Sequence, residues 1–233
     1  MDIEVGFLSK SYISDIPSGG GLFPFGIDGD APYIVEYEGH DVDIETFINN
    51  WMKELNRFPI YTLFTYISYD AEEIGDVFSS ANIEYVKLKI DRETFIKAKI
   101  EDYKQFKVVM PFLYSQGSMN CFAAWSLSED LFSFEKRDMK TLFGRRKVQM
   151  PIVTLRKDCT MFWIFYDGAS VVSLSNDDLF SSTNSIISSF PQDIKGAEVE
   201  YEEWSLYFIS FTNLVTIMWV SGIKKNRSRI TIF

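Results

Sequence analysis

The residues that could do chemistry in this sequence are carboxylates, and they are concentrated near the N-terminus. Residues 1–90 hold 16 Asp and Glu against 5 Lys and Arg, a net charge of −11, whereas residues 91–233 hold 17 against 18. Seven carboxylates lie within residues 28–45, where there is no Lys or Arg: Asp28, Asp30, Glu36, Glu38, Asp41, Asp43 and Glu45. A dense acidic patch attracts basic surfaces and repels phosphates, so we expect a basic protein partner and no direct nucleic acid binding. The alternative is a solvated acidic face that only aids solubility.

Familiar catalytic constellations are not recognisable in the sequence. A Ser-His-Asp or Cys-His mechanism needs an imidazole, and the single histidine, His40, is not accompanied by a Gly-x-Ser-x-Gly motif. Cys121 and Cys159 are far apart in apolar stretches, which indicates neither a disulfide framework nor a thiolate metal site. The glycine-rich residues 17–26 lack the spacing of a phosphate-binding or dinucleotide-binding loop. We therefore expect no cofactor and no enzymatic activity.

One catalytic alternative remains for residues 28–45. His40, Asp41, Asp43 and Glu45 are spaced closely enough to ligate a hard cation, although the glycine and the ligand order of a calcium loop are missing. A hydrolase of unfamiliar type that uses a carboxylate-rich metal site in these residues is the second functional hypothesis.

The chain is organised around a helix predicted over residues 44–56. Its apolar residues recur at the spacing of one helical face: Ile44, Phe47, Ile48, Trp51, Met52 and Leu55. Asp43 precedes this run as an N-cap, and Pro59 favours an end to the helix before it. An apolar face with a tryptophan at its centre has to pack on a sheet.

The stretch before this helix has the alternation of a strand. Tyr33, Val35 and Tyr37 fall on one face, and Ile34, Glu36 and Glu38 fall on the other. After the helix, a strand at 60–68, a helix capped by Asp70 and a strand at 83–90 predict a βαβ unit.

The remainder of the chain predicts mostly strands. We expect a helix over 91–106, a helix from Asn176 to Phe190, and between them short strands at 108–114, 119–127, 131–135, 148–155, 159–166 and 170–174. The predicted class is α+β, with mixed and antiparallel sheets and packed amphipathic helices. An acidic α/β portion (1–106) precedes a strand-rich portion (107–233), and the two could form one continuous domain.

Residues 205–223 carry no charge and are followed by Lys224 and Lys225, which by length resembles a membrane span. Their Ser and Thr content and Asn213 favour instead two paired strands, at 206–211 and 214–220. The acidic N-terminus does not fit a secretory signal, so we expect a cytoplasmic protein without a membrane segment.

These features together favour a non-catalytic binding protein. A compact scaffold with a dense acidic patch, aromatic anchors and no catalytic groups suits an immunity or antitoxin-type protein that masks a basic partner, such as a toxin nuclease. In this hypothesis Glu36 and Glu38 lie at the surface, and Tyr33 and Tyr37 anchor the partner. The expected partner-binding residues are Asp28, Asp30, Tyr33, Glu36, Tyr37, Glu38, Asp41 and Asp43.

Overall fold

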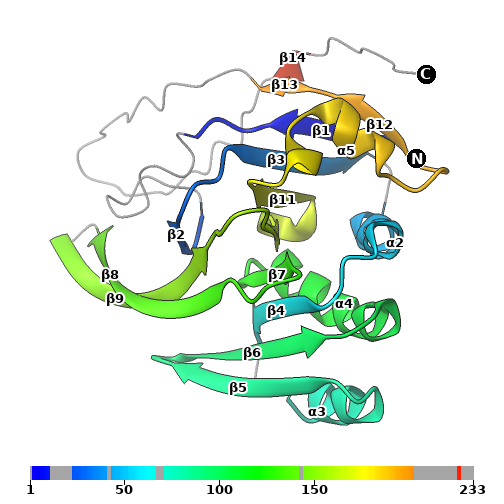
Figure 1. Ribbon diagram of the computed structural model, residues 1–233. Helices are drawn as coiled ribbons and strands as arrows, with labels where there is room; N and C mark the ends of the chain where they lie inside the picture. The colour runs from blue at the N-terminus through cyan, green and yellow to red at the C-terminus, as the bar shows by residue number, and fades with distance from the viewer. Residues whose placement is uncertain are drawn as a thin grey trace.

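A nine-stranded main sheet carries helices on one face and a three-stranded sheet on the other (Figure 1). The computed structural model describes residues 2–10, 23–40, 43–66, 71–141, 144–201 and 225–226. Across the main sheet the strand order is β12 (Lys195–Glu198), β1 (Asp2–Phe7), β3 (Tyr33–His40), β11 (Ser170–Ser175), β10 (Thr160–Ile164), β7 (Ala123–Leu127), β4 (Ile60–Thr65), β6 (Glu93–Ile100) and β5 (Glu84–Ile90). The predicted α+β class is confirmed, and strands from 1–106 and from 107–233 share this one sheet.

Four helices connect parallel strands of the main sheet: α2 (Ile44–Leu55), α3 (Ala71–Ser80), α4 (Tyr103–Ser118) and α5 (Thr183–Ser188). Helix α2 connects β3 to β4 and helix α3 connects β4 to β5. These strands run in the same direction, and both connections step across the sheet toward its β5 edge. Helix α4 connects β6 to β7 and helix α5 connects β11 to β12. These strands run in the opposite direction, and both connections step toward the β12 edge. Because all four helices lie on the same face, the four crossovers have the same hand, as the chirality of such connections requires. The predicted βαβ unit is β4–α3–β5, with β6 inserted between its strands.

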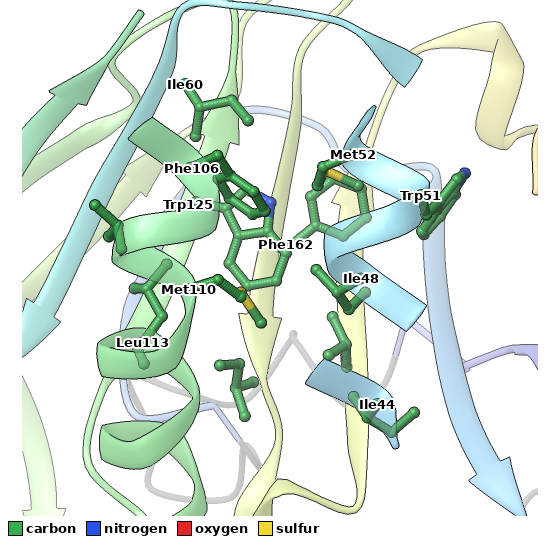
Figure 2. Close-up of a cluster of buried hydrophobic side chains, with 14 of the residues drawn as sticks. Ile44, Ile48, Trp51, Met52, Ile60, Phe106, Met110, Leu113, Trp125 and Phe162 are labelled. Atoms are coloured by element: carbon green, nitrogen blue, oxygen red, sulfur yellow. The ribbon is translucent and has the colours of Figure 1, made fainter. Parts of the chain in front are cut away.

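The helix α2 confirms the sequence prediction for residues 44–56. Asp43 caps it by accepting a hydrogen bond from the backbone N–H of Glu45 at 3.1 Å, and the chain leaves it in the left-handed conformation at Asn56. Trp51 is fully buried, and its indole N–H donates to the Ser189 hydroxyl at 2.9 Å. Beneath α2 and α4 the rings of Trp125 and Phe162 stack with centroids 5.2 Å apart (Figure 2). This aromatic core fixes the helices on the sheet.

The opposite face of the main sheet is covered by β2 (Gly26–Asp28), β9 (Gly144–Thr154) and β8 (Phe132–Thr141). The ring of Phe25 lies 5.4 Å from Trp163 and 5.5 Å from Phe122, which joins this small sheet to the main one. The β8–β9 hairpin is much longer than the predicted strands at 131–135 and 148–155, and in Figure 1 it curves away past the ends of β5 and β6.

Two element predictions are wrong. Residues 91–106 contain strand β6 and the start of α4, not one helix, and residues 108–114 belong to α4 instead of a strand. In β6, buried Ile96, Ala98 and Ile100 alternate with Lys97 and Lys99, which is the pattern of a strand and not of a helix, and Phe95 is buried on the opposite face under the small sheet. Helix α4 is capped by Asp102, which accepts from the Gln105 N–H at 2.9 Å, and it tolerates Pro111 in its interior.

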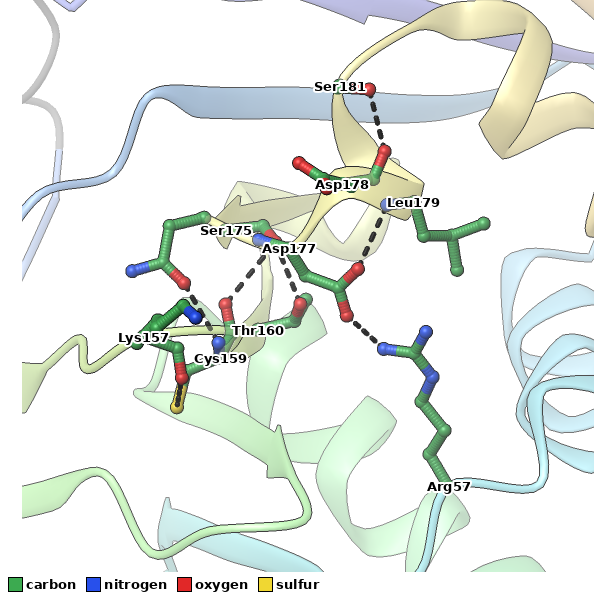
Figure 3. Close-up of polar contacts among 10 residues, drawn as sticks. Arg57, Lys157, Cys159, Thr160, Ser175, Asp177, Asp178, Leu179 and Ser181 are labelled. Carbon is green, nitrogen blue, oxygen red and sulfur yellow. Dashed lines mark hydrogen bonds and ion pairs between the residues drawn. The ribbon is translucent and has the colours of Figure 1, made fainter.

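The helix predicted from Asn176 to Phe190 is divided into a 3₁₀ turn, η4 (Asp178–Phe180), and α5. Asp177, not Asn176, is the cap, because its carboxylate accepts from the Leu179 N–H at 2.9 Å (Figure 3). The same carboxylate pairs with Arg57, just beyond the end of α2, and so ties η4 to that helix.

The strand pair predicted within 205–223 lies outside the residues that the structure describes. Across the described part of the chain, no helix combines the length and apolar character needed to cross a bilayer.

Candidate functional site

Three glutamates come together on the face of the main sheet that the helices do not cover. Glu38 on β3 lies directly opposite Glu4 on β1, and Glu36 lies two positions further along β3, opposite Gly6. Residues with this spacing share a face, and directly opposed side chains on antiparallel strands have Cβ atoms about 5 Å apart. We call Glu4, Glu36 and Glu38 the carboxylate cluster.

Glu36 is the buried member of the cluster, so the expectation that it lies at the surface is wrong. It is 6% exposed, and one carboxylate oxygen accepts a 2.6 Å hydrogen bond from the hydroxyl of Ser170 on the neighbouring strand β11. The strand β3 has partners on both sides, and the chain also covers this face of the sheet. Glu4 and Glu38 are half-buried.

Tyr201, from β13 (Glu200–Tyr201), lies over this face. Its ring packs so closely on Gly6 that any side chain at that position would collide with it, which explains the glycine in the middle of β1. Burial raises the pKa of the Tyr201 hydroxyl far above its usual value, and the nearby carboxylates of Glu36, Glu38 and Glu4 raise it further. The three carboxylates of the cluster therefore lie close to one another and to the Tyr201 ring on this face of the sheet.

The two tyrosines proposed as anchors face the other way. Tyr37 is fully buried against Trp51, with ring centroids 4.9 Å apart, and its hydroxyl lies 2.9 Å from that of Ser173. Burial raises its pKa strongly. Tyr33 is half-buried and packs against the same helix-side core. The predicted alternation of β3 is correct, and it is this alternation that separates the tyrosines from Glu36 and Glu38.

The remaining expected binding residues are dispersed. Asp28 is held by Arg137 of β8 at 2.7 and 2.9 Å, and Asp30 is exposed with Lys10 at 3.5 Å. Asp43 is exposed but serves as the cap of α2. Asp41 lies outside the described residues. Asp28 and Asp43 therefore have structural partners of their own, and the sequence cluster is not one surface patch.

Glu4 and Tyr201 are members of the site that sequence reasoning missed. Glu4 stands in an alternating strand, and counting charge only over residues 28–45 left it out. Nothing in the sequence links Tyr201 to β1, because the two are brought together by the tertiary fold.

In the described part of the chain, no group of three or more His, Cys, Asp and Glu side chains is arranged to hold a metal ion.

Comparison with protein-family models, curated proteins and solved structures found no match. The arrangement of the carboxylate cluster suits the binding of cationic groups, because carboxylates accept several charge-assisted hydrogen bonds from Lys or Arg.

Proposed function

We propose that this chain is a non-catalytic binding protein that recognises a basic protein partner through the carboxylate cluster. The observation that carries the proposal is that Glu4 and Glu38 lie directly opposite one another on β1 and β3, with Glu36 two positions further along the same face. A negative potential concentrated in this way attracts cationic side chains, and it steers a basic partner during the encounter.

An immunity or antitoxin-type function fits this mode of binding. Masking a basic toxin, such as a nuclease, requires a rigid acidic surface and no chemistry of its own. The half-buried Glu4 and Glu38 would contact the partner, while the buried Glu36 would support them through Ser170. In this proposal the protein acts in the cytoplasm, where it would neutralise such a toxin.

The test is affinity capture from the native cell, followed by titration of the captured partner. The bait is the wild-type protein, and the variant is Glu4→Gln with Glu38→Gln, which keeps side-chain size while removing two charges. A matched control, Glu72→Gln with Glu73→Gln, removes two exposed charges from α3 on the helix side of the sheet.

We expect a basic protein to bind the wild type, with a dissociation constant about tenfold larger for the Glu4 and Glu38 variant, equivalent to about 1.4 kcal/mol. The control should bind within about twofold of the wild type. A partner that is not basic, or equal affinity for both variants, would reject the proposal.

A further inference from the structure

The main sheet ends in two edge strands of unequal length, β12 and β5. The edge strand β12 has four residues, whereas β5 has seven, and all seven pair with β6. Among the described residues, β6 is the only strand that pairs with β5 (Figure 1). A long edge strand presents a row of unpaired N–H and C=O groups to any strand that approaches, and short edge strands present few. The β5 edge is therefore the place where the main sheet can be extended.

The side chains of β5 leave this edge accessible. Val86 is 52% exposed, more than any other large apolar side chain in the described chain. Lysines on an edge strand commonly protect it from pairing, but the Lys87 ammonium lies 5.7 Å from the ring centroid of Tyr66 and 6.0 Å from that of Tyr85. Both rings pack against the helix-side core. The charge of Lys87 is therefore held over one face of the sheet and does not block the edge.

The hydrogen bonds of the neighbouring strands show which backbone groups of β5 point outward. The Tyr66 N–H donates to the Thr94 carbonyl oxygen at 3.1 Å, so the backbone groups of Thr94 point toward β4. Those of the next residue, Phe95, point toward β5, where Phe95 pairs with Leu88. Because this direction alternates along a strand, the N–H and C=O groups of residues 85, 87 and 89 point away from β6.

The order of residues in β5 suits pairing with a second copy of itself. A two-fold axis perpendicular to the sheet at Val86 places the two Val86 side chains opposite each other and places Tyr85 of each copy opposite Lys87 of the other. Tyr85 and Lys87 then exchange backbone hydrogen bonds, and the two valines form the closer, non-hydrogen-bonded pair. An axis at Lys87 would place two lysines directly opposite each other, which destabilises a strand pair. The register centred on Val86 avoids this repulsion.

We propose that two copies of this chain associate through antiparallel pairing of their β5 strands, centred on Val86, so that one sheet continues through both. This self-complementary register is the reason to choose a second copy as the occupant of the edge. The inference goes beyond the proposed function and does not depend on it. Strands β1 and β3 lie in the other half of the main sheet, so the dimer carries two carboxylate clusters away from the shared edge.

The first test is sedimentation equilibrium of the full-length protein from about 1 to about 200 µM, because a single strand pair is a small interface of weak affinity. We expect the mass to rise from 27.0 kDa toward twice that value. Val86→Glu places two carboxylates opposite each other and should weaken dimerisation at least about tenfold. The matched control is Met119→Glu, at a 46% exposed apolar residue after α4, which should dimerise within about twofold of the wild type. Each variant is checked for an unchanged melting temperature.

The second test is disulfide cross-linking, which reports the register. In a non-hydrogen-bonded pair the opposed Cα atoms are about 4.5 Å apart, within the range that a disulfide spans, so Val86→Cys should cross-link on mild oxidation. In the same register the two copies of residue 87 are diagonal neighbours about 7–8 Å apart, so Lys87→Cys should cross-link far less. The wild type, with Cys121 and Cys159, gives the background.

A wild type that stays monomeric over the whole concentration range would leave the edge to a different partner and overturn the proposal. Unchanged dimerisation of Val86→Glu, or an equal loss in Met119→Glu, would place the interface elsewhere. Stronger cross-linking at residue 87 than at residue 86 would reject the register centred on Val86.

Discussion

The carboxylate cluster and the β8–β9 hairpin lie on the same side of the main sheet, opposite the helices, but the fold supports them differently. In the cluster, Glu4 lies directly opposite Glu38 on the neighbouring strands β1 and β3. The difference is in the support. Strands β1 and β3 have partners on both sides and a packed core beneath them, whereas residues 135–141 of β8 pair only with β9 in the described chain. The strands that carry the cluster are therefore held by the core, whereas the hairpin is held to the body of the protein through contacts such as the ion pair between Arg137 and Asp28.

The core beneath β3 gives the largest expected effect. Trp51→Ala should lower the free energy of unfolding by roughly 3–5 kcal/mol, because it leaves a large cavity where the ring contacts Tyr37, Phe162 and Phe190. Chemical denaturation monitored by circular dichroism measures this loss. A loss smaller than about 1 kcal/mol would mean that α2 does not hold the cluster strands in place.

Glu36, the buried member of the carboxylate cluster, tests whether a carboxylate of the cluster contributes to the stability of the fold. Glu36→Ala should cost roughly 1–3 kcal/mol of unfolding free energy, because the buried Ser170 hydroxyl loses its acceptor. Glu36→Gln keeps an oxygen there and should cost less. Glu38→Ala, at a half-buried position, should stay within about 0.5 kcal/mol of the wild type in the same denaturation experiment. Equal costs for Glu36→Ala and Glu38→Ala would remove the distinction between a supporting and a contacting carboxylate.

The ion pair between Asp28 of β2 and Arg137 of β8 should give the smallest effect on stability. Asp28→Asn weakens the ion pair with Arg137, and a partly exposed pair of this kind contributes about 1 kcal/mol or less. The loss should shrink as salt is raised, because screening already weakens the wild-type pair. Denaturation at low and high salt measures both effects. A loss well above 1 kcal/mol that is independent of salt would show that the β8–β9 hairpin contributes to folding as strongly as the cluster strands do.

Sequence reasoning succeeded where one local pattern decides the structure. The apolar spacing around Trp51 and the cap at Asp43 were sufficient to predict α2, and alternation correctly assigned the two faces of β3. Alternation could not show that Glu36 would be buried, because Ser170 and Tyr201 come from distant parts of the chain. The same limit applies to Tyr37, whose place in the core depends on Trp51 and Phe162.

The full length of the β8–β9 hairpin was missed for a different reason. Averaging charge over residues 91–233 gave a nearly neutral total, and this hid a run from Lys136 to Lys147 with a strong local excess of cations. Charged residues also interrupt the apolar pattern that marks a strand, so the predicted strands ended at residue 135 and began again at 148, although the hydrogen-bonded pairing continues to Thr141 and Gly144. Backbone pairing, which the sequence does not display, extends the hairpin.

The central claim is that the carboxylate cluster steers a basic partner, and the association rate tests it most directly. The rate constant is measured by stopped flow with the captured partner, at about 50 and about 200 mM salt, for the wild type and for Glu4→Gln with Glu38→Gln. We expect the variant to associate about tenfold more slowly at the lower salt concentration, and its rate to change less between the two concentrations than that of the wild type. An unchanged association rate and an unchanged salt dependence, in a variant that melts like the wild type, would contradict the account.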